Sequence, residues 1–314
     1  MLSACSRSQS ALAPGGPQAR EIGLLGWTMF TGGALIFVLV VALTAVAIVV
    51  PQERRRWLAD GRIVMAGGIA LPVLVLSALL GYGLFVARGQ LNPGEPALRI
   101  EVVGEQWWWR VRYLDGSGGV RFVTANEIRI PIDQPIEFLL TSADVIHSFW
   151  APSLAGKLDM IPGKVNSYTF SADKPGVYRG QCAEYCGAQH ALMAFYVVAM
   201  EPEAFETWAS HQTAPSEQPV TDELRSGQEL FIANGCGACH TVRGTSARGE
   251  IGPDLTHVGG RLSIGAGTLP TNKGTLAGWV ASTQHLKPEV FMPSFGNLEG
   301  KELRAIAAYL ESLE

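Results

Sequence analysis

The chain has little of three features that mark common classes of protein. Only five of its 314 residues are cysteine, and four of these fall in two short motifs, which leaves only Cys5 and makes a disulfide framework unlikely. There is no excess of positive charge: the net charge is -4, which argues against nucleic acid as a partner and is compatible with a basic protein partner. Charged residues make up 17% of the chain and are missing altogether from two long segments.

These two uncharged segments are apolar runs at residues 27–50 and 63–86. Each is long enough to cross a membrane as a helix and longer than a usual core helix of a soluble protein, which is the alternative. Pro72, in the second run, is expected to kink a membrane helix rather than abolish it. The joining segment, residues 51–62, is rich in arginine and therefore expected on the cytoplasmic side, so that both ends of the hairpin emerge outside.

The N-terminus carries a weaker signal. Residues 2–5, Leu-Ser-Ala-Cys, resemble the lipobox of bacterial lipoproteins, but no basic and apolar signal region precedes Cys5. Either translation starts further upstream and Cys5 is the lipidated first residue of the mature chain, or the match is chance. Residues 6–20 are rich in Ser, Ala, Gly and Pro. We therefore expect an N-terminal tether over residues 1–24, followed by the membrane hairpin over residues 25–96.

Residues 97–203 carry short runs of strand-forming residues separated by turn signals. This pattern predicts an all-β sandwich. His147 is expected to end one of its strands, and it can meet a distant loop because strands far apart in sequence can be neighbours in space. The other expected strands cover residues 98–103, 107–113, 120–124, 127–130, 136–141, 165–170, 176–179 and 193–200.

The loop before the last expected strand concentrates metal-binding side chains. Residues 182–193 contain Cys182, Cys186, His190 and Met193. Thiolate, imidazole and thioether are the ligands that soft or borderline redox metals select. Structural zinc is the alternative, because two Cys and two His satisfy a tetrahedral zinc ion. The thioether and the Cys-x-x-x-Cys spacing weigh against zinc.

This region resembles the copper domain of subunit II of haem-copper cytochrome c oxidases. The resemblance extends back through the hairpin to residue 20, and its motifs are residues 104–109, 144–150, 152–154, 159–163 and 180–193. It implies a cupredoxin fold that holds the dinuclear, mixed-valence copper centre called CuA. The implied ligands are the bridging Cys182 and Cys186, the terminal His147 and His190, the weak thioether of Met193 and the backbone carbonyl of Glu184.

The same resemblance implies two further roles. The side chain of Glu184 would bind a magnesium ion shared with the catalytic subunit; the alternative is a solvated loop carboxylate. Trp107, the first residue of a Trp triplet, would be the point at which electrons enter towards copper; the alternative is a packing role. In a strand, Trp107 and Trp109 would share one face. The family often has a glutamate at the start of the second membrane helix, but no acid lies near Met65, so proton uptake through this subunit is not expected.

Residues 222–314 predict a helical domain that binds haem. Thr221 can cap its first helix, and a polar linker over residues 204–221 is expected to let the domains approach without fixing them. Cys236-Gly-Ala-Cys239-His240 is the attachment motif of a c-type haem, in which the two cysteines form thioethers and His240 lies under the iron. A bare Cys-x-x-Cys could instead be a redox pair or half a zinc site, but the adjoining histidine favours haem.

A second axial ligand is needed for a six-coordinate haem, and a thioether opposite histidine raises its potential. Met292 is the candidate, since no other methionine follows the haem motif; a core methionine is the alternative. The domain resembles class I cytochromes c at residues 252–255, 260–261 and 298–313. That resemblance implies that the carbonyl of Pro253 orients His240. The remaining histidines are expected to be solvated: His211, His257 and His285.

The order of hairpin, copper domain and class I cytochrome c domain is similar to subunit II of a caa-type cytochrome c oxidase. This implies a subunit of an oxygen-reducing, proton-translocating enzyme that itself only transfers electrons, from a donor cytochrome through its own haem to CuA and on to subunit I. The implied partners are subunit I, subunit III, a donor cytochrome c or cytochrome bc complex, and membrane lipid. The implied location is the bacterial inner membrane, with both domains on the periplasmic face. Two rivals are the corresponding subunit of a CuA-containing nitric oxide reductase and a stand-alone membrane-tethered electron carrier.

Overall fold

The computed structural model describes residues 7–90 and 95–314, so Cys5 and its lipobox lie outside the described residues. The chain forms two compact units. One covers Arg20–Pro93, and the other combines Met1–Ala19 with Gly94–Glu314.

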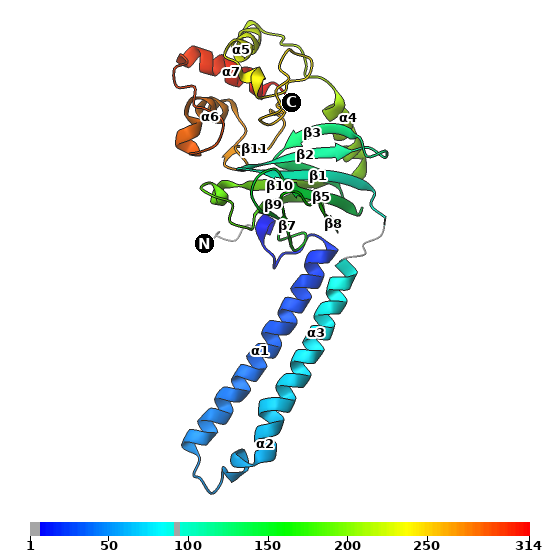
Figure 1. Ribbon diagram of the computed structural model, residues 1–314, viewed down its shortest axis with the longest axis vertical. Coiled ribbons are helices and arrows are strands. Elements are labelled where there is room, and N and C mark those ends of the chain that lie inside the picture. Colours follow the sequence, from blue (N-terminus) through cyan, green and yellow to red (C-terminus); the bar gives the residue numbers. More distant parts are fainter. Residues whose placement is uncertain (1–6, 91–94) are drawn as a thin grey trace. The chain divides into compact units, whose positions relative to one another are not determined.

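The helical unit contains the predicted hairpin (Figure 1). Its helices are α1 (Pro17–Val49), α2 (Gly61–Met65), the π-turn η3 (Ala66–Ala70) and α3 (Leu71–Gln90). Two spans, Pro17–Val49 and Gly61–Arg88, are long and apolar enough to cross a membrane. Pro72 has no N–H, and its ring conflicts with the carbonyl of the preceding turn. The π-turn directly before it relieves that conflict, so the helix continues past Pro72.

Residues 98–200 form the expected all-β sandwich, with a cupredoxin-like pair of five-stranded sheets. The sheet orders are β3-β2-β1-β5-β8 and β4-β10-β9-β6-β7. Alternate residues point into the core, as β5 illustrates by burying Ile136, Phe138 and Leu140. The strands are β1 (Leu98–Glu105), β2 (Trp108–Leu114), β3 (Val120–Ala125), β4 (Glu127–Pro131), β5 (Ile136–Ser142), β6 (His147–Trp150), β7 (Lys157–Met160), β8 (Asn166–Phe170), β9 (Gly176–Cys182) and β10 (Ala194–Met200).

One strand assignment differs from the sequence-based expectation in a way that matters for the metal site. His147 begins β6 rather than ending an earlier strand. β6 pairs antiparallel with β9, and this register places Phe149 opposite Cys182. The pairing therefore brings His147 and the first cysteine of the loop to the same end of the sheet.

The segment expected to be a free tether packs on the sandwich instead. The amide of Gly15 donates to the carbonyl of Ser153, and the amide of Asp173 donates to the carbonyl of Gly15. A Cβ atom on Gly16 would lie 2.2 Å from the carbonyl oxygen of Ser171, so only glycine allows this close approach. The described part of the segment, from residue 7 to α1, is thus fixed to the domain that follows the hairpin.

The first half of the expected linker is also ordered on the sandwich. Residues 202–213 form α4 (Pro202–Thr213), which begins with a proline, a residue well suited to the first helical turn. Phe205 and Ala209 on this helix belong to the buried core of the sandwich. The polar segment that remains between the domains therefore begins after residue 213.

The C-terminal domain is helical, as predicted. Thr221 caps its first helix by accepting a hydrogen bond from the amide of Leu224. The first and last helices of the domain cross closely, because a Cβ atom on Gly227 would lie 2.1 Å from the carbonyl oxygen of Ala305. The elements are α5 (Asp222–Ala233), η5 (Cys236–Ala238), β11 (Ser263–Ile264), β12 (Leu269–Pro270), α6 (Lys273–Leu286) and α7 (Gly300–Glu311).

Candidate metal centre and haem pocket

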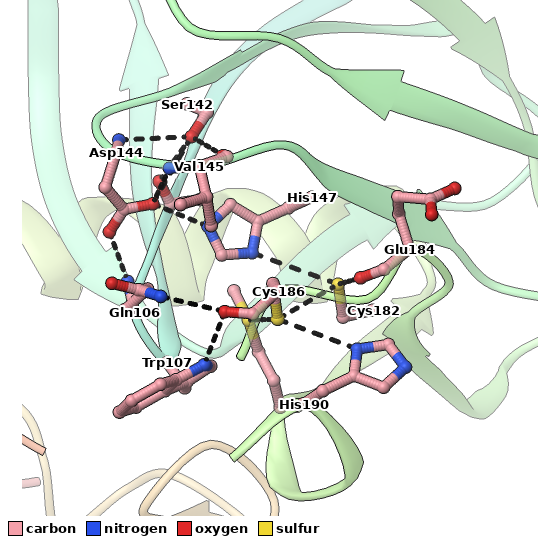
Figure 2. Close-up of polar contacts among 12 residues, drawn as sticks. Gln106, Trp107, Ser142, Asp144, Val145, His147, Cys182, Glu184, Cys186 and His190 are labelled. Atoms are coloured by element: carbon pink, nitrogen blue, oxygen red, sulfur yellow. Dashed lines mark hydrogen bonds and ion pairs between the residues drawn. The ribbon is translucent and has the colours of Figure 1, made fainter. Parts of the chain in front are cut away.

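The predicted copper donors meet at one end of the sandwich (Figure 2). Cys182 ends β9, His147 begins β6, and Cys186 lies in the loop between β9 and β10. The sulfur atoms of the two cysteines are 3.8 Å apart. Both cysteines and His147 are buried, so the donors face one another inside the protein rather than solvent.

Each histidine faces a different sulfur atom. The Nδ1 atom of His147 lies 3.9 Å from the Sγ atom of Cys182, and the Nδ1 atom of His190 lies 3.6 Å from the Sγ atom of Cys186. The Sδ atom of Met193 is 3.8 Å from the Sγ atom of Cys186. The carbonyl oxygen of Glu184 is 3.1 Å from the Sγ atom of Cys182. Two thiols thus lie in the middle, with other donors on either side.

This arrangement differs from a tetrahedral zinc site. With bonds of about 2.3 Å, four ligand atoms around one zinc ion lie within roughly 4 Å of one another. Here the donor atoms of His147, Cys182 and Cys186 all lie within 4.8 Å of one another, and His190 falls outside that group. The donor set is therefore spread along the pair of sulfur atoms.

Asp144 orients His147, a contact to which the sequence analysis gave no role. The Nε2 atom of His147 is 2.8 Å from the Oδ1 atom of Asp144, so that N–H donates to the carboxylate and Nδ1 is left to face Cys182. Burial alone would lower the pKa of His147, but the bonds to Asp144 and Cys182 raise it above its ordinary value. A Cβ atom on Gly104 would lie 2.7 Å from the His147 ring, which explains the glycine in that motif.

The two thiols differ in acidity because they are hydrogen-bonded to each other. The hydrogen bond between the two thiols lowers the pKa of Cys182 well below that of a free thiol. The same bond raises the pKa of Cys186. Cys182 is therefore the first of the two to become a thiolate, the form that binds metal.

The side chain of Glu184 points away from this cluster (Figure 2). Its carboxylate is about half exposed and lies 3.7 Å from the Nζ atom of Lys157. Backbone and side chain of Glu184 thus face different directions, with the carbonyl towards Cys182 and the carboxylate towards the surface.

Trp107 lies in the turn between β1 and β2 rather than in a strand, so the strand-face argument does not apply to it. The residue is 6% exposed rather than presented to solvent. Its indole N–H donates to the carbonyl of Cys186 at 2.9 Å, and the side-chain amide of Gln106 donates to the same oxygen at 2.8 Å (Figure 2). Trp107 is therefore bonded directly to the loop that carries the metal donors.

In the C-terminal domain, the predicted haem residues surround one cavity of about 530 Å³. Cys236, Cys239, His240 and Met292 all line it. The rest of its wall is mainly apolar and includes Phe231, Leu255, Val258, Leu276, Val280, Ile306 and Leu310. A mainly apolar cavity of this size with a few polar groups is typical of a cofactor pocket.

His240 is held in the form that iron needs. Its Nδ1 atom is 2.8 Å from the carbonyl oxygen of Pro253, so this N–H donates and Nε2 keeps its lone pair. Burial lowers the pKa of His240, which favours the neutral ring. A Cβ atom on Gly252 would lie 2.6 Å from the same ring, so glycine is required beside it.

Two further residues support this site, although the sequence assigned an individual role to neither. Gln284 donates through its side-chain amide to the carbonyls of Val290 and Met292, and so holds the methionine loop. Arg261 lines the cavity, and its buried Nε atom has no hydrogen-bond partner within the described ranges. The Nη2 atom of Arg261 donates to the carbonyl of Asp254, and the remaining buried Nε–H is a donor that fits a carboxylate group of a haem.

His257 is buried, at 4% exposure, which corrects the sequence-based expectation that it is solvated. Its Nδ1 atom is 2.6 Å from the carbonyl oxygen of Glu314, and its Nε2 atom is 3.1 Å from that of Ala214. The ring of His211 packs against it, with 4.8 Å between the ring centroids. His257 therefore joins the end of α4 to the C-terminal residues rather than facing water.

The sandwich and the helical domain share the haem cavity, since Gln106, Trp107 and Trp108 also line it. The expectation that the linker leaves the domains unfixed does not match their contacts. The amide of Ala194 donates to the carbonyl of Ala266 at 3.0 Å, and the amide of Leu262 donates to a carboxylate oxygen of Glu127 at 2.7 Å. The domains are thus hydrogen-bonded to each other within one compact unit.

Comparisons with known proteins match both domains. Residues 117–200 match the family described as cytochrome c oxidase subunit II, periplasmic domain, and residues 224–314 match the family described as cytochrome c. Cytochrome c oxidase subunit 2 of Alkalihalophilus pseudofirmus is 35% identical over 247 residues, which cover 78% of this chain and 70% of that protein. The Bacillus subtilis protein of the same name is 32% identical over 230 residues, which cover 70% of this chain and 63% of that protein.

Among solved structures, the periplasmic domain of subunit II of cytochrome oxidase from Bradyrhizobium japonicum is similar at 32% sequence identity. The match covers 38% of this chain and 95% of that structure, with a TM-score of 0.36.

Proposed function

The chain belongs to the cytochrome c oxidase subunit 2 family, and on that premise we propose that it receives electrons at a haem c and passes them through CuA to the oxygen-reducing subunit of a haem-copper oxidase. The observation that carries the proposal is the position of Trp107, which lines the haem cavity and donates a hydrogen bond to Cys186 among the copper donors. When bound, the two groups supply one-electron redox couples. The chain's own residues hold them, keep water away and connect them.

At the copper centre, Cys182 and Cys186 would bridge two ions, with His147 and His190 as terminal ligands. Met193 and the carbonyl of Glu184 would complete the two coordination shells. The distances between these donors support this assignment because the non-bridging donors are divided between the two sulfur atoms. The exposed carboxylate of Glu184 is free of the copper donors and would contribute to a magnesium site shared with subunit I.

At the haem, Cys236 and Cys239 would form the thioether bonds, and His240 and Met292 would be the axial ligands. The bond from His240 to the carbonyl of Pro253 supports this, since it leaves Nε2 available to iron. Arg261 would pair with a haem carboxylate. The mainly apolar wall of the pocket would keep water away from the cofactor.

The partners and location follow from the family. Subunit I is the proposed electron acceptor, subunit III a further neighbour, and a cytochrome c or cytochrome bc complex the donor. The two spans Pro17–Val49 and Gly61–Arg88 would anchor the chain in the bacterial inner membrane, with both cofactor domains on the periplasmic side. The relatives named above are oxidase subunits, so neither a nitric oxide reductase nor a stand-alone carrier is favoured.

Purification in mild detergent tests the cofactor content and the partner together. We expect two copper ions and one covalent haem c for each chain, with a haem-copper subunit in the same complex. Replacing Cys186 with Ser should abolish the near-infrared band and mixed-valence EPR signal of CuA, because one bridging thiolate is lost, while the haem spectrum stays native. One zinc ion and no copper would refute the copper assignment.

Trp107→Ala tests the route between the centres. Both optical spectra should stay nearly native because Trp107 is not a ligand, while electron transfer from haem to copper slows in a rapid-mixing measurement. Val177→Ala is the control, since Val177 lies on β9 of the same sandwich but is 42% exposed. A native rate in Trp107→Ala would mean that the tryptophan has only a packing role.

A further inference from the structure

Lys287 is a fully buried lysine between the two domains. It follows α6 directly and is 1% exposed. Its Nζ atom donates to the backbone carbonyls of Trp107 at 2.8 Å, Leu192 at 2.8 Å and Gly265 at 2.9 Å. An ammonium group has three N–H donors and no acceptor, so these three carbonyls satisfy it completely.

Two of these carbonyls belong to the sandwich, whereas Gly265 and Lys287 itself belong to the helical domain. Trp107 is the residue whose indole is bonded to the copper loop, and Leu192 directly precedes Met193 in that loop. Lys287 begins the segment that leads from α6 to Met292. One ammonium group therefore joins the turn and the loop beside the copper donors to the loop that carries the proposed haem ligand.

A charge at this position is costly unless it is fully paired. Burial lowers the pKa of Lys287 to about 7, which reflects how strongly the surroundings disfavour the ammonium form. Two of the three carbonyls that offset this cost are present only when the domains are together. The ammonium group of Lys287 is therefore fully hydrogen-bonded only when the domains are docked. These hydrogen bonds in turn stabilise the docked arrangement.

The surfaces around Lys287 approach closely. Val290 packs against the hydrophobic core of the sandwich. A Cβ atom on Gly267 would lie 2.9 Å from the Cβ atom of Ala194, so only a glycine at that position allows the hairpin of β11 and β12 to reach β10 without displacing it. Lys287 thus lies within a fitted interface rather than at its rim.

We propose that Lys287 is a positioning residue for electron transfer, which locks the haem domain onto the sandwich so that the haem cavity faces Trp107. The role of Lys287 in electron transfer rests on the proposed function. Whether Lys287 holds the two domains together can be tested without it. Lys287 acts through the backbones of Trp107 and Leu192 and touches no cofactor ligand in these hydrogen bonds. The helical domain is accordingly a fixed part of the electron path rather than a module that swings on its linker.

Amide hydrogen exchange on the full-length protein in detergent tests the lock directly. Lys287→Met keeps the length of the side chain and removes all three donors. The amides of Ala194 and Leu262 bond across the interface and should exchange about tenfold faster, which corresponds to about 1.4 kcal/mol of lost docking free energy. The amides of Tyr196 and Leu255 bond within their own domains and should keep their native protection.

Lys273→Met is the matched control. Lys273 lies at the start of the same helix, and its Nζ atom pairs with Glu223 inside the helical domain. The same substitution there should leave the amides of Ala194 and Leu262 protected. Equal protection of these two amides in Lys287→Met and native protein would overturn the proposal.

Electron transfer provides the second readout. The native haem-to-copper rate should not depend on solvent viscosity, because the domains are already docked. In Lys287→Met the undocked fraction should rise by about tenfold, so that a slow, viscosity-dependent phase of electron transfer gains amplitude by about the same factor, while the optical spectra of both centres stay native. An unchanged amplitude of this slow phase would overturn the proposal.

Lys287→Leu, which also has no donor, replaces the methionine variant if that variant is not recovered folded; unchanged exchange there would equally overturn the lock. A chain that lacks copper or haem would contradict the proposed function, but the exchange measurement would still decide whether Lys287 locks the domains.

Discussion

The copper donors and the haem pocket are organised in opposite ways. The copper donors lie at the ends of neighbouring strands, where the register of β6 and β9 places His147 near Cys182. Their positions follow from backbone pairing in a sandwich with its own hydrophobic core. The haem residues instead surround a cavity of about 530 Å³ whose wall is formed by core side chains, such as Phe231 and Ile306.

This difference has a physical consequence. In the sandwich, a ligand can be removed while the core remains, because the core lies beside the site. In the helical domain, the cofactor would itself be the centre of the core, so that attaching it and folding the domain are coupled. The comparison predicts that the two regions respond differently to the loss of their cofactors.

The largest effect is expected for the double substitution Cys236→Ala and Cys239→Ala. Without haem attachment the helical domain should lose its cooperative fold, a loss comparable to the whole stability of a small domain, about 5–15 kcal/mol. The sandwich should still bind copper with a native EPR signal. Limited proteolysis after residue 214 measures the first effect, with Cys186→Ser as the reciprocal control that loses copper and keeps a folded helical domain. Native protease resistance in the double variant would contradict the comparison.

Met292→Ala should have a large but local effect. The haem stays attached through Cys236 and Cys239, but the thioether ligand is lost and the haem potential falls, within the roughly 0.8 V over which axial ligands set such potentials. A redox titration and the sulfur-to-iron charge-transfer band measure this change. Met193→Ala is the counterpart at the copper site and should leave the haem potential unchanged. An intact charge-transfer band in Met292→Ala would identify another axial ligand.

Asp144→Asn should weaken the copper site without unfolding the sandwich. The amide cannot accept from His147 as a charged carboxylate does, so the ring loses its fixed orientation. Loss of such a supporting group typically lowers metal affinity by about 10- to 100-fold. Competition with a copper chelator measures the affinity, and Asp115→Asn, in an exposed turn of the same sandwich, is the control. Equal affinities in native protein and Asp144→Asn would show that strand register alone orients His147.

The smallest expected effect is a loss of stability of the helical domain at low pH. Burial lowers the pKa of His240 and of His257 in the helical domain. Below about pH 6.5 the unfolded chain takes up protons on these histidines more readily than the folded domain does, so stability is lost as pH falls, by up to about 2 kcal/mol for each histidine at about pH 5. His147 in the sandwich has a raised pKa, so its protonation at low pH stabilises the folded sandwich instead.

Denaturant unfolding at two pH values, followed by haem absorbance for one domain and sandwich fluorescence for the other, measures this difference. His257→Gln should reduce the acid loss in the helical domain only. An equal loss of stability at low pH in both domains would contradict this predicted difference between them.

The sequence predicted best where one short stretch carries the chemistry. Cys182, Cys186, His190 and Met193 are close in sequence, so their meeting requires only a loop. Cys236, Cys239 and His240 are likewise consecutive enough for one helical turn to align them. His147 and Met292 are distant from their partners, and only the chemical need for a further ligand indicated them.

The sequence predicted less well where a segment without a periodic pattern takes its structure from a neighbour. Residues 7–16 and 202–213 have the composition of a tether and a linker, but both pack on the sandwich. His257 has no local feature that distinguishes it from a solvated histidine, and its burial results from contacts with Ala214 and Glu314.

The sequence by itself determined the hairpin, the sandwich, the helical domain and the two sets of donors, because apolar length, strand alternation and ligand spacing are local properties. Only the tertiary structure decided that Asp144 orients His147, that Trp107 is buried between copper donors and haem cavity, and that Lys287 joins the two domains. These contacts connect residues far apart in the chain. They form because an unpaired carbonyl or ammonium group is costly when it is buried. These groups become buried only once the domains have folded and docked.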